Sequence, residues 1–355
     1  MCSTNIRNRK ASSQQEFNQS DYTTLDKSVQ PVTFSPKDLE KRSLEDREKL
    51  HKHAKSKAYS IALAIPLLNV TKDNKKMYLR VFDCATTALR NGKKLTYDRY
   101  CNSRICFRCN KIRTAKLIDG YTEAFEQMKD PYSVTLTDVN VKGSYLSKEI
   151  EAYNSDFLKF RRNYKKKTGK SVSGIRKLEI TYNVKDNTYH PHAHIIVDGK
   201  EEAFALRYAW LKRRPSADIR CNHIVKADKG TLKELFKYMT KLIGNEETDY
   251  KALDHIITVT KGKRIVQPFG EFRKIAPAIS EDVDDRDAQN YSCLSEDGHE
   301  IYTYERKAYD WVSNYGECLT EYIPSDLDRL YLDGNQKKFI EERNRISESY
   351  KNTKQ

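Results

Sequence analysis

The densest group of chemically versatile side chains is a histidine-rich stretch over residues 189–197. His190, His192 and His194 alternate with small or apolar residues, and they are three of the eight histidines in the chain. Side chains two positions apart on an extended strand point to the same face. Neutral imidazole is the commonest protein ligand for metal ions. The alternation therefore predicts a metal site on one face of a strand.

A carboxylate is expected to join these imidazoles. A second predicted strand precedes the histidines, across a turn-forming sequence. If the hairpin is centred between Asp186 and Asn187, Glu179 lies opposite His194 and diagonal to His192. Cross-strand neighbours lie about 5 Å apart, within reach of one shared ion. We therefore predict that this carboxylate and two imidazoles converge.

Cysteines form a second candidate centre. Cys106 and Cys109 have the two-residue spacing of a zinc knuckle, in which one tight turn points two thiolates at an ion, and Cys101 and Cys84 could complete a four-thiolate site. The alternative is a set of buried free thiols. The first residues of the chain lack the apolar core of a secretory signal, so disulfides are not expected.

A third group lies on a helix predicted over residues 230–244. Its apolar residues recur at helical spacing and form one face. Glu234, Tyr238 and Lys241 share the opposite face at i, i+4 and i+7. A tyrosine between a carboxylate and an ammonium group can act as a nucleophile. The alternative is a surface tyrosine, one of 23 in the chain, beside an ordinary helical pair.

These groups together predict phosphoryl-transfer chemistry on a polyanion. A metal held by two histidines and a carboxylate polarises a phosphoryl oxygen, and a tyrosine phenolate can form a covalent phosphotyrosyl link. The chain has 65 Lys and Arg against 50 Asp and Glu, a net charge of +15, which favours a nucleic-acid partner. No GxxxxGK[S/T] sequence is present, so we expect no ATPase or helicase module.

In this order, the motifs resemble those of the rolling-circle replication initiators of small bacterial plasmids, single-tyrosine members of the HUH endonuclease superfamily. The resemblance implies an α+β HUH fold with a central antiparallel sheet flanked by helices, a cysteine-rich N-terminal module and a helical C-terminal extension. It covers roughly residues 80–275. The matching blocks are residues 101–109, 134–137, 178–183, 188–194, 237–241 and 262–270.

The resemblance also implies roles at the metal site. His192 and His194 match the paired metal ligands, and Glu179 matches a third ligand position. His190 would either support these ligands or face DNA. Two imidazoles and a carboxylate suit Mn²⁺ or Mg²⁺ with open water positions, and zinc could also occupy such a site.

The implied activity is nicking and rejoining of plasmid origin DNA through a covalent 5′-phosphotyrosyl intermediate. Tyr238 matches the nucleophile and Glu234 a carboxylate that activates water or a hydroxyl at termination, while Lys241 would stabilise the phenolate or the scissile phosphate. The expected partners are the double-strand origin, presented as single strand or hairpin, and a host helicase. The expected location is the cytoplasm, and a dimer is one expected assembly.

Basic side chains near these motifs are the predicted DNA contacts, although the run over residues 161–167 also fits a solvated helix end. No membrane partner is expected, because the longest apolar run, residues 59–70, is too short to span a bilayer. The predicted contacts are Arg104, Arg108, Arg113, Arg161, Arg162, Lys165, Lys166, Arg213, Arg214 and Lys237.

Two other functions fit the same motifs. A mobilisation relaxase or a one-tyrosine transposase would perform the same chemistry on a different DNA. A non-catalytic DNA-binding regulator would use the histidines for a structural zinc, and it would bind DNA without cleaving it.

The elements that must position these residues follow from composition and periodicity. The β-branched alternation indicates strands over residues 132–141 and within residues 216–227, and apolar periodicity indicates helices over residues 116–129 and 146–164. The predicted organisation is a polar, mostly disordered segment over residues 1–55, a cysteine-rich zinc-binding module over 56–125, the HUH nuclease domain over 126–275, and an acidic loop with a helical extension over 276–355.

Overall fold

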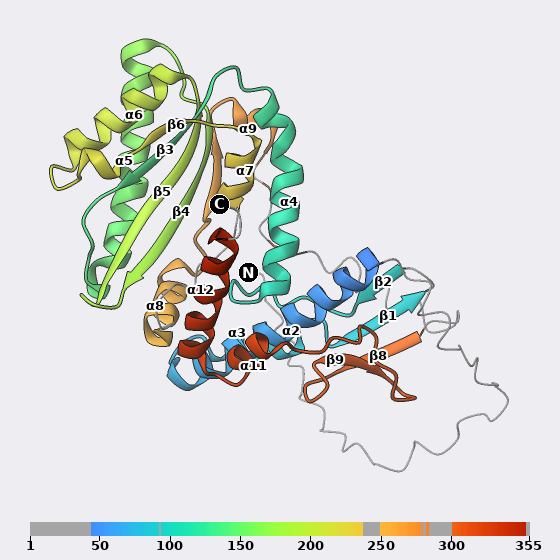
Figure 1. The fold of residues 1–355 in the computed structure, drawn as a ribbon. Helices are drawn as coiled ribbons and strands as arrows, with labels where there is room; N and C mark the ends of the chain where they lie inside the picture. The colour runs from blue at the N-terminus through green and yellow to red at the C-terminus, as the bar shows by residue number, and fades with distance from the viewer. Residues whose placement is uncertain are drawn as a thin grey trace, which may run out of the picture. The chain divides into compact units, whose positions relative to one another are not determined.

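The computed structural model combines helices with two antiparallel sheets (Figure 1). This confirms the predicted α+β class. No helix among the described residues is long and apolar enough to cross a membrane. Lys237, Tyr238 and Lys241 lie outside the described residues. The structure describes residues 44–91, 94–236, 249–277, 279, 282–283 and 300–352.

The larger sheet has five strands in the order β6-β3-β5-β4-β7, with every neighbouring pair antiparallel. The histidine-rich strand β5 lies in the middle, between β3 and β4. Its side chains are therefore held by a partner strand on each side. The strands are β3 (Pro131–Thr137), β4 (Gly174–Asn183), β5 (Thr188–Asp198), β6 (Ile224–Lys226) and β7 (Val266–Phe269).

Helices α5 (Gly143–Thr168) and α6 (Lys200–Arg213) cover one face of this sheet (Figure 1). The odd-numbered residues of β5 face them, and Ile195 packs with Phe157 and Trp210 in a buried cluster. Because side chains alternate along a strand, the even-numbered residues of β5, which include the histidines, face the other side.

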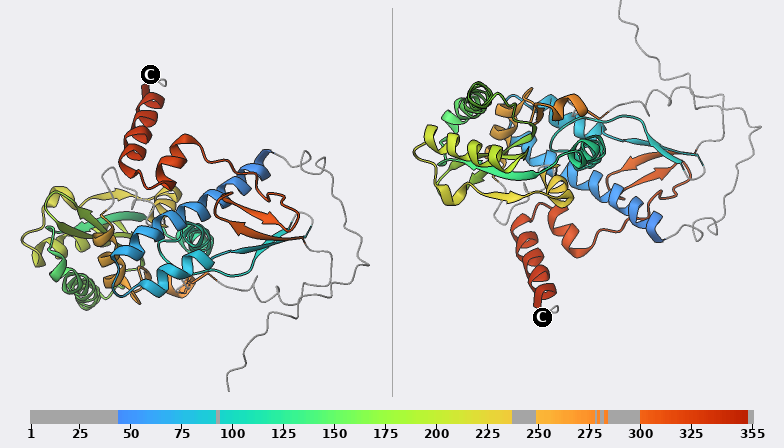
Figure 2. Two further views of the ribbon diagram at one scale, coloured as in Figure 1. Left: turned by 90° about the horizontal axis from the view of Figure 1, so that it is seen from below. Right: turned by 90° about the horizontal axis from the view of Figure 1, so that it is seen from above.

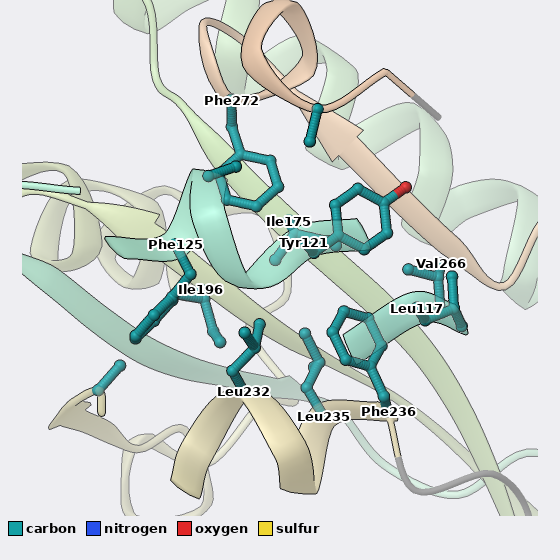
Figure 3. Packing of buried hydrophobic residues seen from close by; sticks show 13 residues of the cluster. Leu117, Tyr121, Phe125, Ile175, Ile196, Leu232, Leu235, Phe236, Val266 and Phe272 are labelled. Atoms are coloured by element: carbon teal, nitrogen blue, oxygen red, sulfur yellow. The ribbon is translucent and has the colours of Figure 1, made fainter. Parts of the chain in front are cut away.

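Helices α4 (Phe107–Glu126), α7 (Lys229–Phe236) and α9 (Phe272–Ile275) pack against that second face. Their buried cluster includes Ile175 of β4 and Ile196 of β5 (Figure 3). On this face of the sheet, Ile175 and Ile196 pack against α4 and α7. The polar histidines lie on the same face, further along β5.

The β4–β5 hairpin has a register that differs from the prediction. Glu179 pairs with His192 rather than with His194, and the loop occupies residues 184–187. The side-chain oxygen of Asn183 accepts a hydrogen bond from the Lys185 N–H (3.0 Å), which starts the turn earlier. A shift of two residues leaves every side chain on its face, whereas a shift of one would have reversed the strand.

Other boundaries also differ from prediction for local reasons. Helix α4 begins at Phe107, not at residue 116, because Cys106 caps its first turn. The strand predicted within residues 216–227 shortens to β6, because the Asp218 side chain caps a 3₁₀ turn over Ile219–Cys221. Helix α5 extends to Thr168, where Gly169 at φ +73° ends it.

The smaller sheet joins segments that are far apart in the sequence. Its order is β2-β1-β8-β9, so the cysteine-rich module and the C-terminal extension form one structural unit (Figure 2). Trp311 is fully buried there, and its indole N–H donates to the carbonyl oxygen of Ala85 (2.8 Å). The strands are β1 (Thr87–Asn91), β2 (Lys94–Tyr97), β8 (Glu300–Glu305) and β9 (Asp310–Ser313).

Five helices remain in the described part of the chain: α2 (Leu44–Val70), α3 (Lys75–Asp83), α8 (Tyr250–Thr260), α11 (Asp326–Leu332) and α12 (Gln336–Asn352). The first of them, α2, begins inside the segment predicted to be mostly disordered, since residues 44–55 are helical.

A buried carboxylate ties α11 to α2. Asp328 accepts hydrogen bonds from the hydroxyls of Tyr59 (2.7 Å) and Tyr322 (2.9 Å), and Lys55 Nζ lies 2.6 Å from it. Burial would raise the pKa of Asp328, but the hydrogen bonds from Lys55, Tyr59 and Tyr322 outweigh it and lower the pKa to about 2. The ionised form therefore stabilises the folded state.

We predict that Asp328→Asn lowers the free energy of unfolding by about 2 kcal/mol at pH 7, because it weakens charge-assisted hydrogen bonds. The stabilisation by a carboxylate of lowered pKa is present above its ordinary pKa of about 4 and is lost as the pH falls towards the folded-state value. Urea unfolding of both proteins should show a difference that shrinks below about pH 4. Asp326→Asn, at an exposed position of the same helix, is the control and should change little.

Candidate functional site

The structure brings the three predicted metal ligands together. Glu179 Oε2 lies 3.4 Å from His192 Nε2 and 3.5 Å from His194 Nε2. The side chains of Glu179, His192 and His194 are 19%, 12% and 31% exposed, so the group opens to solvent on the side of His194. The new register favours this convergence, since Glu179 lies directly opposite His192 and diagonal to His194.

The hydrogen bonds of the rings orient their free nitrogens toward Glu179. His192 Nδ1 lies 3.1 Å from the main-chain oxygen of His190, so in the neutral ring Nδ1 carries the proton and Nε2 the lone pair. His194 Nδ1 lies 3.4 Å from the hydroxyl of Thr135. A lone pair facing a carboxylate oxygen is unfavourable unless a proton or a cation lies between them.

This donor set fits a divalent cation. Two ligands held about 2.1 Å from one ion lie about 3.0 Å apart at an octahedral angle and about 3.4 Å apart at a tetrahedral one. The 3.4 and 3.5 Å separations are close to that range. Main-chain and hydroxyl partners on the far nitrogens are the usual support for metal-binding imidazoles.

A buried lysine, which sequence reasoning missed, holds the other oxygen of the carboxylate. Lys177 Nζ lies 2.6 Å from Glu179 Oε1, and the Lys177 side chain is only 4% exposed. Burial would raise the pKa of Glu179, but its contacts with the His192 and His194 rings and the charge of Lys177 hold it well below its ordinary value. The signal in the sequence was the position of Lys177, two residues from Glu179 on the same strand.

His190 has a supporting contact instead of a place among the converging atoms. Its Nε2 is hydrogen-bonded to the Thr137 hydroxyl, and its main-chain oxygen orients His192. Burial, followed by the neighbouring His192 ring, lowers the pKa of His190. These contacts are compatible with a supporting role, which stays a prediction, as does a contact with DNA.

Helix α7 places its apolar face as predicted. Leu232, Leu235 and Phe236 pack with residues of α4 in a buried cluster (Figure 3). Glu234 is exposed. The predicted nucleophile and its basic neighbours follow α7 and lie outside the described residues, so their roles stay predictions.

The four predicted cysteine ligands form a buried cluster. Sulfur–sulfur distances are 3.6 Å for Cys84–Cys109, 3.7 Å for Cys101–Cys109 and 3.7 Å for Cys84–Cys106. Main-chain N–H groups point at two of the sulfurs: that of Cys109 at Cys106 (3.5 Å) and that of Ser103 at Cys101 (3.4 Å). At Cys106, the hydrogen bonds from Cys101, Cys109 and Cys84 and the N–H of Cys109 outweigh burial and lower the pKa of the thiol.

Three of the predicted DNA contacts are instead buried parts of the fold. The Arg108 guanidinium lies 3.6 Å from the Tyr97 ring centroid, and Arg113 donates to the main-chain oxygen of Asn102 (3.0 Å). Arg214 pairs with Asp138 (3.1 Å), and its other carboxylate partners are Glu149 and Asp156. The sequence shows their charge but not these distant partners.

The other predicted DNA contacts that the structure describes are either partly buried or exposed. Arg104 donates to the main-chain oxygens of Thr260 (2.9 Å) and Lys263 (2.6 Å), and Arg161 lies over the Phe269 ring at 5.1 Å. Arg213 is partly exposed. Exposed positions occur at the end of α5, which covers the sheet face opposite the histidines. They are Arg162, Lys165 and Lys166.

Comparison with known proteins identifies the family. A family model described as "Replication protein" matches residues 92–317. Proteins named "Protein rep" are similar in part: one from Staphylococcus aureus is 30% identical over 133 residues, which cover 36% of this chain and 57% of that protein. One from Bacillus amyloliquefaciens is 35% identical over 121 residues, covering 32% of this chain and 35% of that protein.

A longer match is to "Protein rep" of Lentilactobacillus hilgardii, which is 25% identical over 287 residues, 71% of this chain and 89% of that protein. The matched region thus spans little more than half of the Staphylococcus aureus relative and about a third of the Bacillus one. No solved structure matches the chain. Because the family model covers well over half of the sequence, the chain belongs to the replication protein (Rep) family, as its motifs predicted.

Proposed function

We propose that this protein is a rolling-circle plasmid replication initiator with an HUH endonuclease fold, and that it nicks and rejoins origin DNA through Tyr238. The observation that carries the proposal is the convergence of Glu179 Oε2 with His192 Nε2 and His194 Nε2 on the central strand pair. Membership of the replication protein family supports it.

Glu179, His192 and His194 would hold the cation, Mn²⁺ or Mg²⁺. When bound, such an ion supplies Lewis-acid polarisation of a phosphoryl oxygen of the scissile phosphate. The protein's own contribution is rigidity. The two strands fix the three ligands, Lys177 holds Glu179 in its ionised form, and the main chain of His190 orients the His192 ring.

The chemical step is a transesterification. The Tyr238 phenol loses its proton and its oxygen attacks phosphorus, while the bond from phosphorus to the 3′ oxygen breaks. The 5′ phosphate stays on the tyrosine, and the released 3′ oxygen takes up a proton and becomes a primer. Lys241 would stabilise the phenolate or the phosphate.

After nicking, the single catalytic tyrosine is already joined to the 5′ phosphate. Termination therefore requires a second nucleophile. Glu234 would act as the general base for water or for a hydroxyl. It is exposed on α7, at a helical spacing of four residues from Tyr238.

The DNA partner follows from charge. A net charge of +15 suits a polyanion. The exposed Arg162, Lys165 and Lys166 and the partly exposed Arg213 are the remaining described candidates for phosphate contacts, and Lys237, outside the described residues, stays a predicted one. We propose that the nick site is presented as single strand or hairpin, and that a host helicase unwinds the template in the cytoplasm.

Tyr238→Phe should abolish the covalent adduct between the full chain and a labelled origin oligonucleotide in Mn²⁺, because the ring lacks its oxygen. Denaturing gel electrophoresis measures the adduct. Tyr208→Phe, at an exposed tyrosine on α6, is the control and should form adduct normally. Adduct that persists in Tyr238→Phe would refute the nucleophile, and wild-type protein that binds but never cleaves would indicate the non-catalytic regulator.

Glu179→Gln should weaken Mn²⁺ binding by at least about tenfold, since it removes the only charge among the three ligands while keeping their shape. Titration calorimetry on the full chain measures this without DNA. Glu201→Gln, at an exposed position on α6, provides the matched control. Equal Mn²⁺ affinity in Glu179→Gln and wild type would place the ion elsewhere.

A further inference from the structure

The cysteine cluster has the dimensions of a tetrahedral metal site. Four thiolates about 2.3 Å from a zinc ion lie about 3.8 Å from one another. The observed sulfur–sulfur distances of 3.6 to 3.7 Å are close to this edge and far from the roughly 2.05 Å of a disulfide. The four sulfurs all lie within 4.8 Å of one another, so the cluster can hold one ion without rearrangement.

A buried lysine supplies independent evidence for a negatively charged centre. Lys57 is 1% exposed, and its Nζ donates to the main-chain oxygens of Phe82 (2.6 Å) and Cys84 (2.5 Å). It forms no ion pair with a carboxylate in the part of the chain that the structure describes. A buried ammonium group is costly without an opposite charge nearby. Zinc with four thiolates has a net charge of −2, which would offset it.

The cluster is built into the start of α4. Cys106 caps this helix and Cys109 lies in its first turn, so a bound ion would fix the helix at one end. Helix α4 is 20 residues long, and at 1.5 Å per residue it extends about 30 Å from the cysteines to the sheet.

The same helix holds the end of α7. The Thr114 hydroxyl donates to the main-chain oxygen of Phe236 (3.0 Å), and the Tyr121 ring stacks on the Phe236 ring with centroids 5.6 Å apart. Phe236 is fully buried, and Figure 3 shows its ring facing Tyr121. Phe236 precedes Tyr238 by two residues.

We infer that Cys84, Cys101, Cys106 and Cys109 bind a structural zinc ion, and that this ion positions α7 through α4. Thr114 and Tyr121 are then positioning residues for the segment that carries the nucleophile. The role of Thr114 and Tyr121 in positioning the nucleophile rests on the proposed function. The zinc site and the contact between α4 and α7 do not depend on it.

The zinc site is tested by metal analysis of the full chain. We expect one zinc per wild-type chain and its loss in Cys109→Ser. Cys221→Ser, at an exposed cysteine, should keep the ion. Replacement by Co²⁺ should give the visible absorption of a tetrahedral cobalt thiolate. Wild-type protein that neither carries nor takes up either metal would overturn the site, even if Cys109→Ser fails to fold.

The mechanical link is tested by hydrogen exchange, which needs no DNA cleavage. Removal of zinc by a chelator should make amides of α4 and α7 exchange at least about tenfold faster, while those of the β4–β5 hairpin change little. Unchanged exchange in α7 would refute the coupling and leave the zinc site intact.

The positioning role is tested with Thr114→Val in single-turnover nicking. We expect unchanged zinc content and Mn²⁺ affinity, nicking slowed by about tenfold, and recovery in Thr114→Ser. The control is Thr122→Val on the same helix, whose hydroxyl donates to Ile118 of α4 itself. Wild-type rates in Thr114→Val would refute the role. A wild-type protein that does not nick would refute the proposed function, while the zinc and exchange results would still decide this inference.

Discussion

The pairing of β4 with β5 is the constraint on which the site depends. Glu179 faces His192 across the hairpin because the opposite faces of these strands are fixed by burial, with Ala193, Ile195 and Val197 packed under α5 and α6. A slip of one residue would expose these apolar side chains and bury the imidazoles. The hydrophobic effect on one face therefore sets the position of the ligands on the other.

A second constraint comes from outside the sheet. Helix α4 carries two of the cysteines at its start and contacts α7 through Thr114 and Tyr121 further along, so it connects two centres of different chemistry. Thiolates select zinc, whereas a carboxylate with two imidazoles and open positions also accepts Mn²⁺ or Mg²⁺. The cysteine centre would stabilise the fold, and the centre of Glu179, His192 and His194 would bind the phosphate.

The site was more predictable from the sequence than the fold around it. Alternation revealed the histidine strand, and spacing revealed the cysteines, because both signals are local. The register depends on the hydrogen bond that the Asn183 side-chain oxygen accepts from the Lys185 N–H. The pairing of β1 with β8 joins residues more than 200 positions apart, which no local pattern reports. Arg108 and Arg214 were misjudged for the same reason, since the Trp311 ring near Arg108 and the Asp138 carboxylate paired with Arg214 are distant in sequence. Turn details and long-range partners decide such features, and composition does not contain them.

The most direct measurement is identification of the residue that carries DNA after reaction with an origin oligonucleotide in Mn²⁺. Proteolysis and mass spectrometry of the wild-type adduct would locate the attached nucleotide. If Tyr238 is the nucleophile and Glu179, His192 and His194 hold the ion, the nucleotide will be found on Tyr238 through its 5′ phosphate, and only when the metal is present. Attachment to another residue, or an adduct that forms equally well in a chelator, would contradict the proposed centre.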